Sequence, residues 1–205
     1  MSGKGPKEAI SPFSFEDNEF IIKKKFLSLG NEYYVKDSEG NNIAFCQEKS
    51  LSIKGELRLF RTKDKTDELF RIKQRNILDF TGTFQVFESG TENTLGFLKR
   101  NWAKSMVLGE WKIFDENREV VAEAEEDSLV KEVIRFKGLK RLPYRYKLYR
   151  DGKKIGVCKQ RVSLLKKMYR LQIDDDLEDK LDSRLFISLA LLLDAVERKF
   201  KKIGK

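Results

Sequence analysis

The sequence predicts a mainly β fold, a closed antiparallel barrel of about twelve strands around a central hydrophobic C-terminal helix. Five segments repeat one pattern, in which an alternating apolar strand meets Asp, Gly or Asn and a second alternating strand follows. One segment near the C-terminus is apolar without a polar stripe at helical spacing. The chain of 205 residues, which has only two cysteines, is long enough to bury a core without disulfides.

The five repeats predict five β-hairpins, because period-two alternation around turn residues is the signature of a hairpin. Asp151-Gly152 is the clearest turn, since a two-residue turn with positive φ favours this pair. Two further strands are expected at 20–29 and 168–173. A closed barrel leaves no strand edge exposed. The hairpins are expected at residues 34–44, 57–72, 84–98, 111–122 and 146–157.

The Asp151-Gly152 turn also predicts a register for its hairpin. Leu148 is expected opposite Ile155, and Tyr146 opposite Val157, with these four side chains on the inner face. Alternation then assigns the neighbouring residues to the outer face. The residues expected outside are Arg145, Lys147, Tyr149, Lys154 and Cys158.

A buried helix is expected at about 183–199. Asp182-Ser183 is a good helix cap, and the residues from Leu185 to Val196 are mostly apolar. The uninterrupted apolar run Leu189–Leu193 is far shorter than the ~20 residues that a bilayer requires. Asp194 would also be costly within a membrane. A core helix is therefore favoured over a membrane span.

Charge is unevenly distributed along the chain. Residues 1–127 contain 20 Lys and Arg against 23 Asp and Glu, whereas residues 128–205 contain 22 against 10. Within residues 131–170 the count is 15 against two. Such an excess favours an anionic partner, either phospholipid headgroups, nucleic acid or an acidic protein, although a solvated charged surface is the simpler alternative.

No catalytic residue, metal ligand set or cofactor-binding motif is predicted. The chain has no histidine, which removes the commonest acid-base residue and the commonest metal ligand. A non-enzymatic protein is therefore expected. Residues 1–19 are interpreted as a flexible lead-in to a single domain at 20–205, and they lack the apolar core of a signal peptide. The expected location is cytoplasmic, or peripheral at a membrane.

The candidate binding site is a basic wall on the outside of the barrel. Lysine and arginine pair with phosphates by charge, and arginine adds bidentate geometry. The residues 23–25 are three lysines that extend this wall if they lie beside it. The predicted lipid-phosphate-binding residues are Arg145, Lys147, Lys154, Lys166, Lys167 and Arg170.

An acidic segment at 174–182 precedes the predicted helix. It lacks the turn glycine and the twelfth-position glutamate of an EF-hand loop. Acidic residues before a helix also favour its positive N-terminal end. A role of these acids in stabilising the N-terminus of the helix is therefore favoured, and calcium binding is kept as the alternative.

The ordered series of hairpins and closing helix resembles the tubby C-terminal-like superfamily, which includes LURP-one-related proteins and phospholipid scramblases. The resemblance covers about Phe26 to Phe200. It is carried by residues 35–40, 77–86, 95–100 and 111–115, and most of all by residues 169–173 leading into 181–194. It implies a twelve-stranded barrel with the last helix inside, and phosphoinositide binding through basic side chains on the barrel wall.

The sequence and this resemblance together predict a binding module that docks on anionic phospholipids through its basic face. A cytosolic protein-interaction or scaffold domain is the alternative. Nucleic-acid binding is less favoured because alternation places most aromatic side chains inside. Calcium-linked lipid scrambling is less favoured because the helix carries Asp194.

Overall fold

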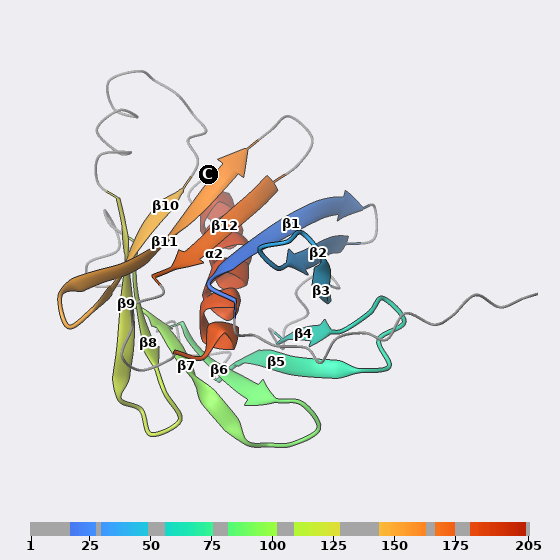
Figure 1. Ribbon diagram of the computed structural model, residues 1–205, viewed down its shortest axis with the longest axis horizontal. Helices are drawn as coiled ribbons and strands as arrows, with labels where there is room; N and C mark the ends of the chain where they lie inside the picture. Colours follow the sequence, from blue (N-terminus) through green and yellow to red (C-terminus); the bar gives the residue numbers. More distant parts are fainter. Residues whose placement is uncertain are drawn as a thin grey trace, which may run out of the picture.

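The computed structural model describes residues 17–27, 30–48, 56–75, 82–101, 109–127, 144–162, 167–174 and 181–203. Twelve strands form one closed antiparallel barrel, in which each strand pairs with its neighbours in sequence and β1 pairs with β12 (Figure 1). The predicted fold class is confirmed. The strands are β1 (Glu19–Leu27), β2 (Gly30–Lys36), β3 (Asn42–Glu48), β4 (Glu56–Phe60), β5 (Glu68–Gln74), β6 (Thr83–Glu88), β7 (Thr94–Arg100), β8 (Glu110–Phe114), β9 (Val120–Glu126), β10 (Arg145–Arg150), β11 (Lys153–Val162) and β12 (Lys167–Ile173).

Alternation of side chains, interrupted by bulges, builds the wall of the barrel. In β4, Leu57 and Leu59 are buried at the centre, whereas Arg58 between them is exposed. The predicted Asp151-Gly152 turn is present, with positive φ values of 49° and 75° at its two residues. This geometry matches the right-handed twist of the flanking strands.

One detail of the predicted register is wrong. A bulge between Leu148 and Tyr149 shifts the pairing, so that Tyr146 lies opposite Cys158 and Leu148 opposite Gly156. Cys158 therefore faces inward and is 1% exposed, not outward as predicted. Val157 pairs with Lys147 and takes the outward place. A bulge adds one residue to one strand, and every later side chain on that strand changes face.

The helix α2 (Ser183–Ile203) lies inside the barrel (Figure 1). Its start agrees with the prediction, and its end lies beyond the predicted residue 199. The backbone N–H of Arg184 donates to the Asp182 carboxylate at 2.9 Å, which confirms Asp182 as the helix cap. Among the described residues, no helix combines the length and the apolar character that crossing a membrane requires.

Close packing between α2 and the wall depends on small residues and complementary apolar side chains. Phe186, Ile187 and Leu189 are fully buried. A Cβ atom at Gly96 of β7 would lie 2.2 Å from the Phe114 carbonyl oxygen and 3.0 Å from a Leu185 methyl carbon. Each apolar side chain buried in this way contributes about 1.5–3 kcal/mol before ordering entropy is subtracted. The helix is thus an integral part of the core.

Candidate functional site: a basic outer face and a buried aspartate

Three cations lie side by side on the outside of the barrel. Arg145 of β10 is directly opposite Lys159 of β11, and Lys159 is directly opposite Arg170 of β12. Residues opposed in this way have Cβ atoms about 4.5–5.5 Å apart. The register thus assembles a row of positive charge from residues that are 11 and 14 positions apart in sequence.

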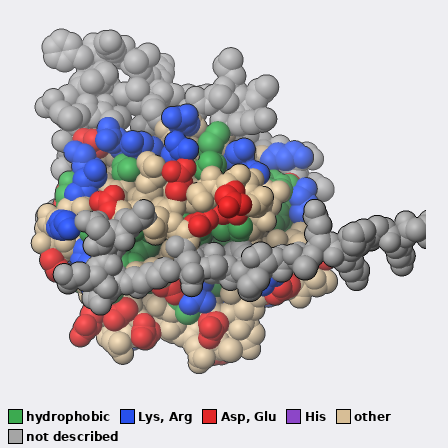
Figure 2. Space-filling model, in the orientation of Figure 1, with side chains coloured by type: hydrophobic (Ala, Val, Ile, Leu, Met, Phe, Trp, Pro, Cys, Tyr) green, Lys and Arg blue, Asp and Glu red, His purple; other side chains and the backbone are tan. Residues whose placement is uncertain are grey.

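The same face continues over β1, where Lys23 lies opposite Met168 of β12, and Met168 lies opposite Arg161 of β11. We call the outward side chains of β10, β11, β12 and β1 the basic face. Figure 2 shows lysine and arginine side chains along the upper part of the drawn surface, where these strands run. The basic face has a single outward acid, Glu19. Its eight cations are Lys23, Lys25, Arg145, Lys147, Lys154, Lys159, Arg161 and Arg170.

Two carboxylates balance part of this charge. Asp127, which is 4% exposed, lies 3.6 Å from the Arg145 guanidinium and 3.4 Å from the Lys147 ammonium. Glu19 lies 2.8 Å from the Arg170 guanidinium. Each pair orients its cation while leaving part of the side chain in solvent. The ion pairs thus hold three cations in place on the face.

The structure places the six predicted binding residues in different surroundings. Arg145, Lys147 and Arg170 lie together on the basic face. Lys154 lies opposite Tyr149 at the turn, five residues along β11 from Lys159, which corresponds to roughly 16 Å. Lys166 lies outside the described residues. Lys167 shares the inward alternation of Tyr169 and Leu171, so its place on the outer wall is corrected.

Sequence reasoning missed Lys159 and Arg161 and left the lysines at 23–25 unplaced. Alternation along β11 would have found Lys159 and Arg161 if the bulge had been recognised, since both share the face of Val157. Lys23 and Lys25 extend the face as anticipated. Lys24 points into the barrel.

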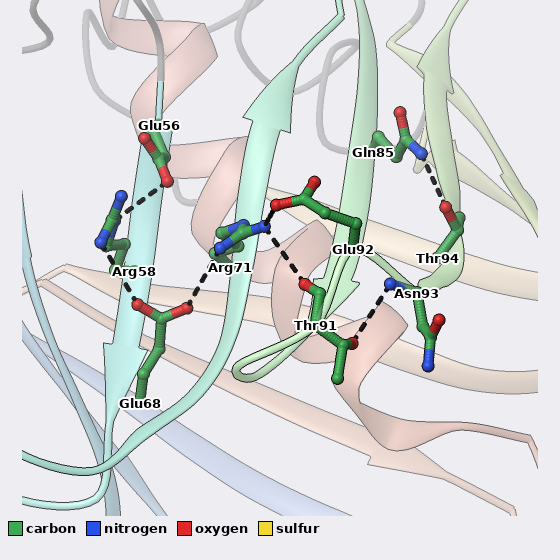
Figure 3. A network of polar contacts seen from close by, with 9 residues as sticks. All are labelled: Glu56, Arg58, Glu68, Arg71, Gln85, Thr91, Glu92, Asn93 and Thr94. Atoms are coloured by element: carbon green, nitrogen blue, oxygen red, sulfur yellow. Dashed lines mark hydrogen bonds and ion pairs between the residues drawn. The ribbon is translucent and has the colours of Figure 1, made fainter.

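A second group of arginines lies on the outer face of β4 and β5 and differs from the basic face. Arg58 lies 3.0 Å from Glu56 and 3.5 Å from Glu68, and Arg71 lies 3.9 Å from the other oxygen of Glu68. Arg71 also pairs with Glu92 in the turn between β6 and β7 (Figure 3). Here each arginine has at least two carboxylate partners. The network is compensated internally and offers little excess charge to a ligand.

Inside the barrel, Asp194 of α2 is the centre of a buried polar cluster. Its Oδ2 atom accepts from the Lys24 ammonium at 2.6 Å and from the Tyr33 hydroxyl at 2.7 Å. Its Oδ1 atom accepts from the Tyr169 hydroxyl at 2.8 Å and lies 3.6 Å from the Lys167 ammonium. A buried carboxylate is tolerated only when it is paired and hydrogen-bonded in this way.

The cluster extends one strand further. The Gln160 amide donates to the Tyr169 hydroxyl at 2.7 Å and accepts from the backbone N–H of Tyr144 at 3.1 Å. Burial, and then the charge of Asp194, raise the pKa of the Tyr169 hydroxyl, which therefore stays a hydrogen-bond donor. Four strands, β1, β2, β11 and β12, are thus connected to α2 through one carboxylate.

The acidic segment before the helix is described at Asp174, Leu181 and Asp182, whereas residues 175–180 lie outside the described residues. Asp182 caps α2 and forms a bidentate pair with Arg184. In the part of the chain that the structure describes, no group of three or more His, Cys, Asp or Glu residues is arranged to hold a metal ion. Calcium binding by residues 174–182 stays a hypothesis.

Comparisons with known proteins agree with this architecture. An X-ray structure of a protein from Arabidopsis thaliana superimposes with a TM-score of 0.52 and 13% sequence identity, over 87% of this chain and 91% of that one. This likeness shows the fold alone. No curated protein sequence matches the chain. The family model for LURP-one-related proteins matches residues 18–194, from just before β1 to the buried aspartate of α2. The chain therefore belongs to the LURP-one-related family, whose tubby-like barrel it shares.

Proposed function

We propose that the protein is a non-enzymatic module that binds anionic phospholipid headgroups through the basic face. The observation that carries this proposal is the presence of eight outward cations against one outward acid on four adjacent strands. Each basic residue near an anionic membrane contributes about 1 kcal/mol to binding. The resemblance to phosphoinositide-binding tubby domains supports the same ligand class.

The chemistry of the face suits an interface between water and lipid. Met168 and Ile21 are half-buried and lie among the cations, with Met168 between Arg161 and Lys23. The aliphatic stems of lysine and arginine cover apolar surface while their charged heads reach outward. The combination supplies phosphate contacts and a modest apolar surface on the same strands.

Vesicle sedimentation tests the proposal directly. We expect binding to vesicles that contain phosphatidylserine and weak binding to vesicles of phosphatidylcholine alone, with affinity falling as salt screens the charges. The double substitution Lys159→Glu and Arg161→Glu should weaken binding to the anionic vesicles by roughly tenfold or more.

A matched control changes the net charge equally on another part of the barrel. Lys73→Glu and Lys99→Glu alter exposed residues of β5 and β7, away from the basic face. This variant should keep most of the vesicle binding. Equal losses in both double variants would show that net charge, not the basic face, is responsible. Absent vesicle binding together with capture of an acidic protein would favour a protein-interaction domain instead.

A further inference from the structure

Three aromatic residues form a row on the side of the wall that faces away from α2, next to the basic face. Tyr34 of β2 lies opposite Phe45 of β3, which lies opposite Phe60 of β4. The Tyr34 and Phe45 rings meet edge to face, with centroids 5.4 Å apart and an interplanar angle of 64°. These rings face away from the core cluster that surrounds α2. Tyr34 is half-buried and Phe45 is 4% exposed, so the two rings make a corner that other side chains of the protein largely cover.

A cation of the chain itself occupies this corner. Lys63, in the turn between β4 and β5, places its ammonium 5.0 Å from the centroid of Tyr34 and 6.0 Å from that of Phe45. The Tyr34 hydroxyl donates to the Glu32 carboxylate at 2.6 Å. Interaction with Tyr34 and the charge of Glu32 raise the pKa of the Lys63 ammonium. Two rings and one carboxylate thus act on the same cation.

Lys63 contacts the aromatic corner through its side chain. It is exposed, and its turn is closed without it by the Arg61–Asp67 ion pair at 2.6 Å. Its neighbour Lys65 donates instead to Gln47 of β3. The Lys63 side chain is therefore free to leave the corner without altering either strand.

We propose that Tyr34, Phe45 and Glu32 form a binding site for a quaternary ammonium group of the choline type, which Lys63 fills in the free protein. Aromatic faces attract such cations electrostatically, and a quaternary ammonium, which has no N–H groups, needs no hydrogen-bond acceptor. Lys23 lies directly opposite Tyr34, one strand away. A phosphocholine group therefore fits best, with its ammonium on the rings and its phosphate at Lys23.

This site does not depend on lipid binding by the basic face, because choline carries no phosphate. Two titrations test the site. Choline chloride and phosphocholine are added separately to the full chain, and NMR follows the signals of the Tyr34 ring. Both should shift the Tyr34 signals, with phosphocholine binding more tightly. Lys63→Ala should tighten choline binding by about two- to fivefold, since the competing cation is gone.

Matched variants locate the effect. Lys65→Ala changes a lysine of the same turn and should leave choline binding at the wild-type value. Tyr34→Leu keeps apolar bulk without the π face and should abolish binding while the circular dichroism spectrum is unchanged. Lys23→Ala should remove the advantage of phosphocholine over choline. Binding of the wild type, but not of Tyr34→Leu, to phosphatidylcholine vesicles would identify a lipid headgroup as the source. Binding of soluble phosphocholine alone would identify a free ligand.

Two results would overturn the proposal. One is choline binding that survives in Tyr34→Leu. The other is choline binding that is no tighter in Lys63→Ala than in Lys65→Ala, including no binding to either. Loss of binding to anionic vesicles in the Lys159→Glu, Arg161→Glu variant concerns the basic face alone and leaves this site standing.

Discussion

Lys23 and Lys24 are adjacent in sequence, yet the barrel wall separates them into opposite environments. Lys23 is exposed on the basic face, where it lies opposite Met168. Lys24 is 2% exposed and ion-paired with Asp194 inside the barrel. The comparison shows that this fold uses cations in two ways. Inward lysines hold the helix in its place, and outward ones create the charged surface.

The inward and outward lysines should differ most in their effect on stability. Lys24→Ala leaves Asp194 without its closest cation, and breaking a buried ion pair costs about 3–5 kcal/mol of unfolding free energy. Lys23→Ala should change it by less than about 0.5 kcal/mol. Chemical denaturation of both variants measures the difference. Similar values for the two would contradict the inward role of Lys24.

The hydroxyl of Tyr33 should matter less than the Lys24 ammonium. Tyr33→Phe removes one donor from the Asp194 carboxylate while the ring stays in place. A hydrogen bond to a charged group contributes about 1.5–3 kcal/mol. The outward Tyr34→Phe substitution, which removes the bond to Glu32 at a half-buried surface position, is the matched control and should cost clearly less in the same denaturation experiment.

The buried thiol of Cys158 should make stability fall at alkaline pH. Burial raises its pKa from 9.0 to about 12, so the folded protein keeps the proton that the unfolded chain releases. Its contribution is constant below pH 9.0 and is lost between pH 9.0 and about 12, by about 1.4 kcal/mol per pH unit. Comparing the pH dependence of the unfolding free energy between Cys158→Ala and wild type isolates the contribution of this thiol. Parallel curves would contradict it.

The smallest expected effect on stability concerns the outer cations. Lys159→Gln should leave the unfolding free energy within about 0.5 kcal/mol of wild type. The same substitution should weaken binding to phosphatidylserine vesicles by about fivefold, which corresponds to about 1 kcal/mol. Thermal unfolding and sedimentation on the same sample measure both quantities. A large fall in the melting temperature would show that Lys159 supports the fold itself.

Local patterns were sufficient to predict the fold. Alternation and turn residues identified the hairpins, and the apolar run with its cap at Asp182 identified α2. These signals depend on residues that are close together in the chain. The face of Cys158 was mispredicted because a bulge is a backbone irregularity that alternation does not reveal.

The candidate site was predicted only in part. Charge counting found the basic segment 131–170, and Arg145, Lys147 and Arg170 do share one face. Lys167 was placed on the wrong face, since it lies opposite Lys24 with both side chains directed toward Asp194. A charge count does not tell on which side of the barrel wall a lysine side chain lies. That side decides whether the lysine can contact a ligand or is buried in the core.

The sequence by itself determined the strands, the helix and the excess of positive charge, because each arises from the periodicity and composition of neighbouring residues. The tertiary structure alone decided which cations converge and what Asp194 does. Asp194 contacts Lys24 and Tyr33 across separations of 170 and 161 residues. Closure of β1 onto β12 creates these contacts, and no local pattern encodes a pairing over such distances.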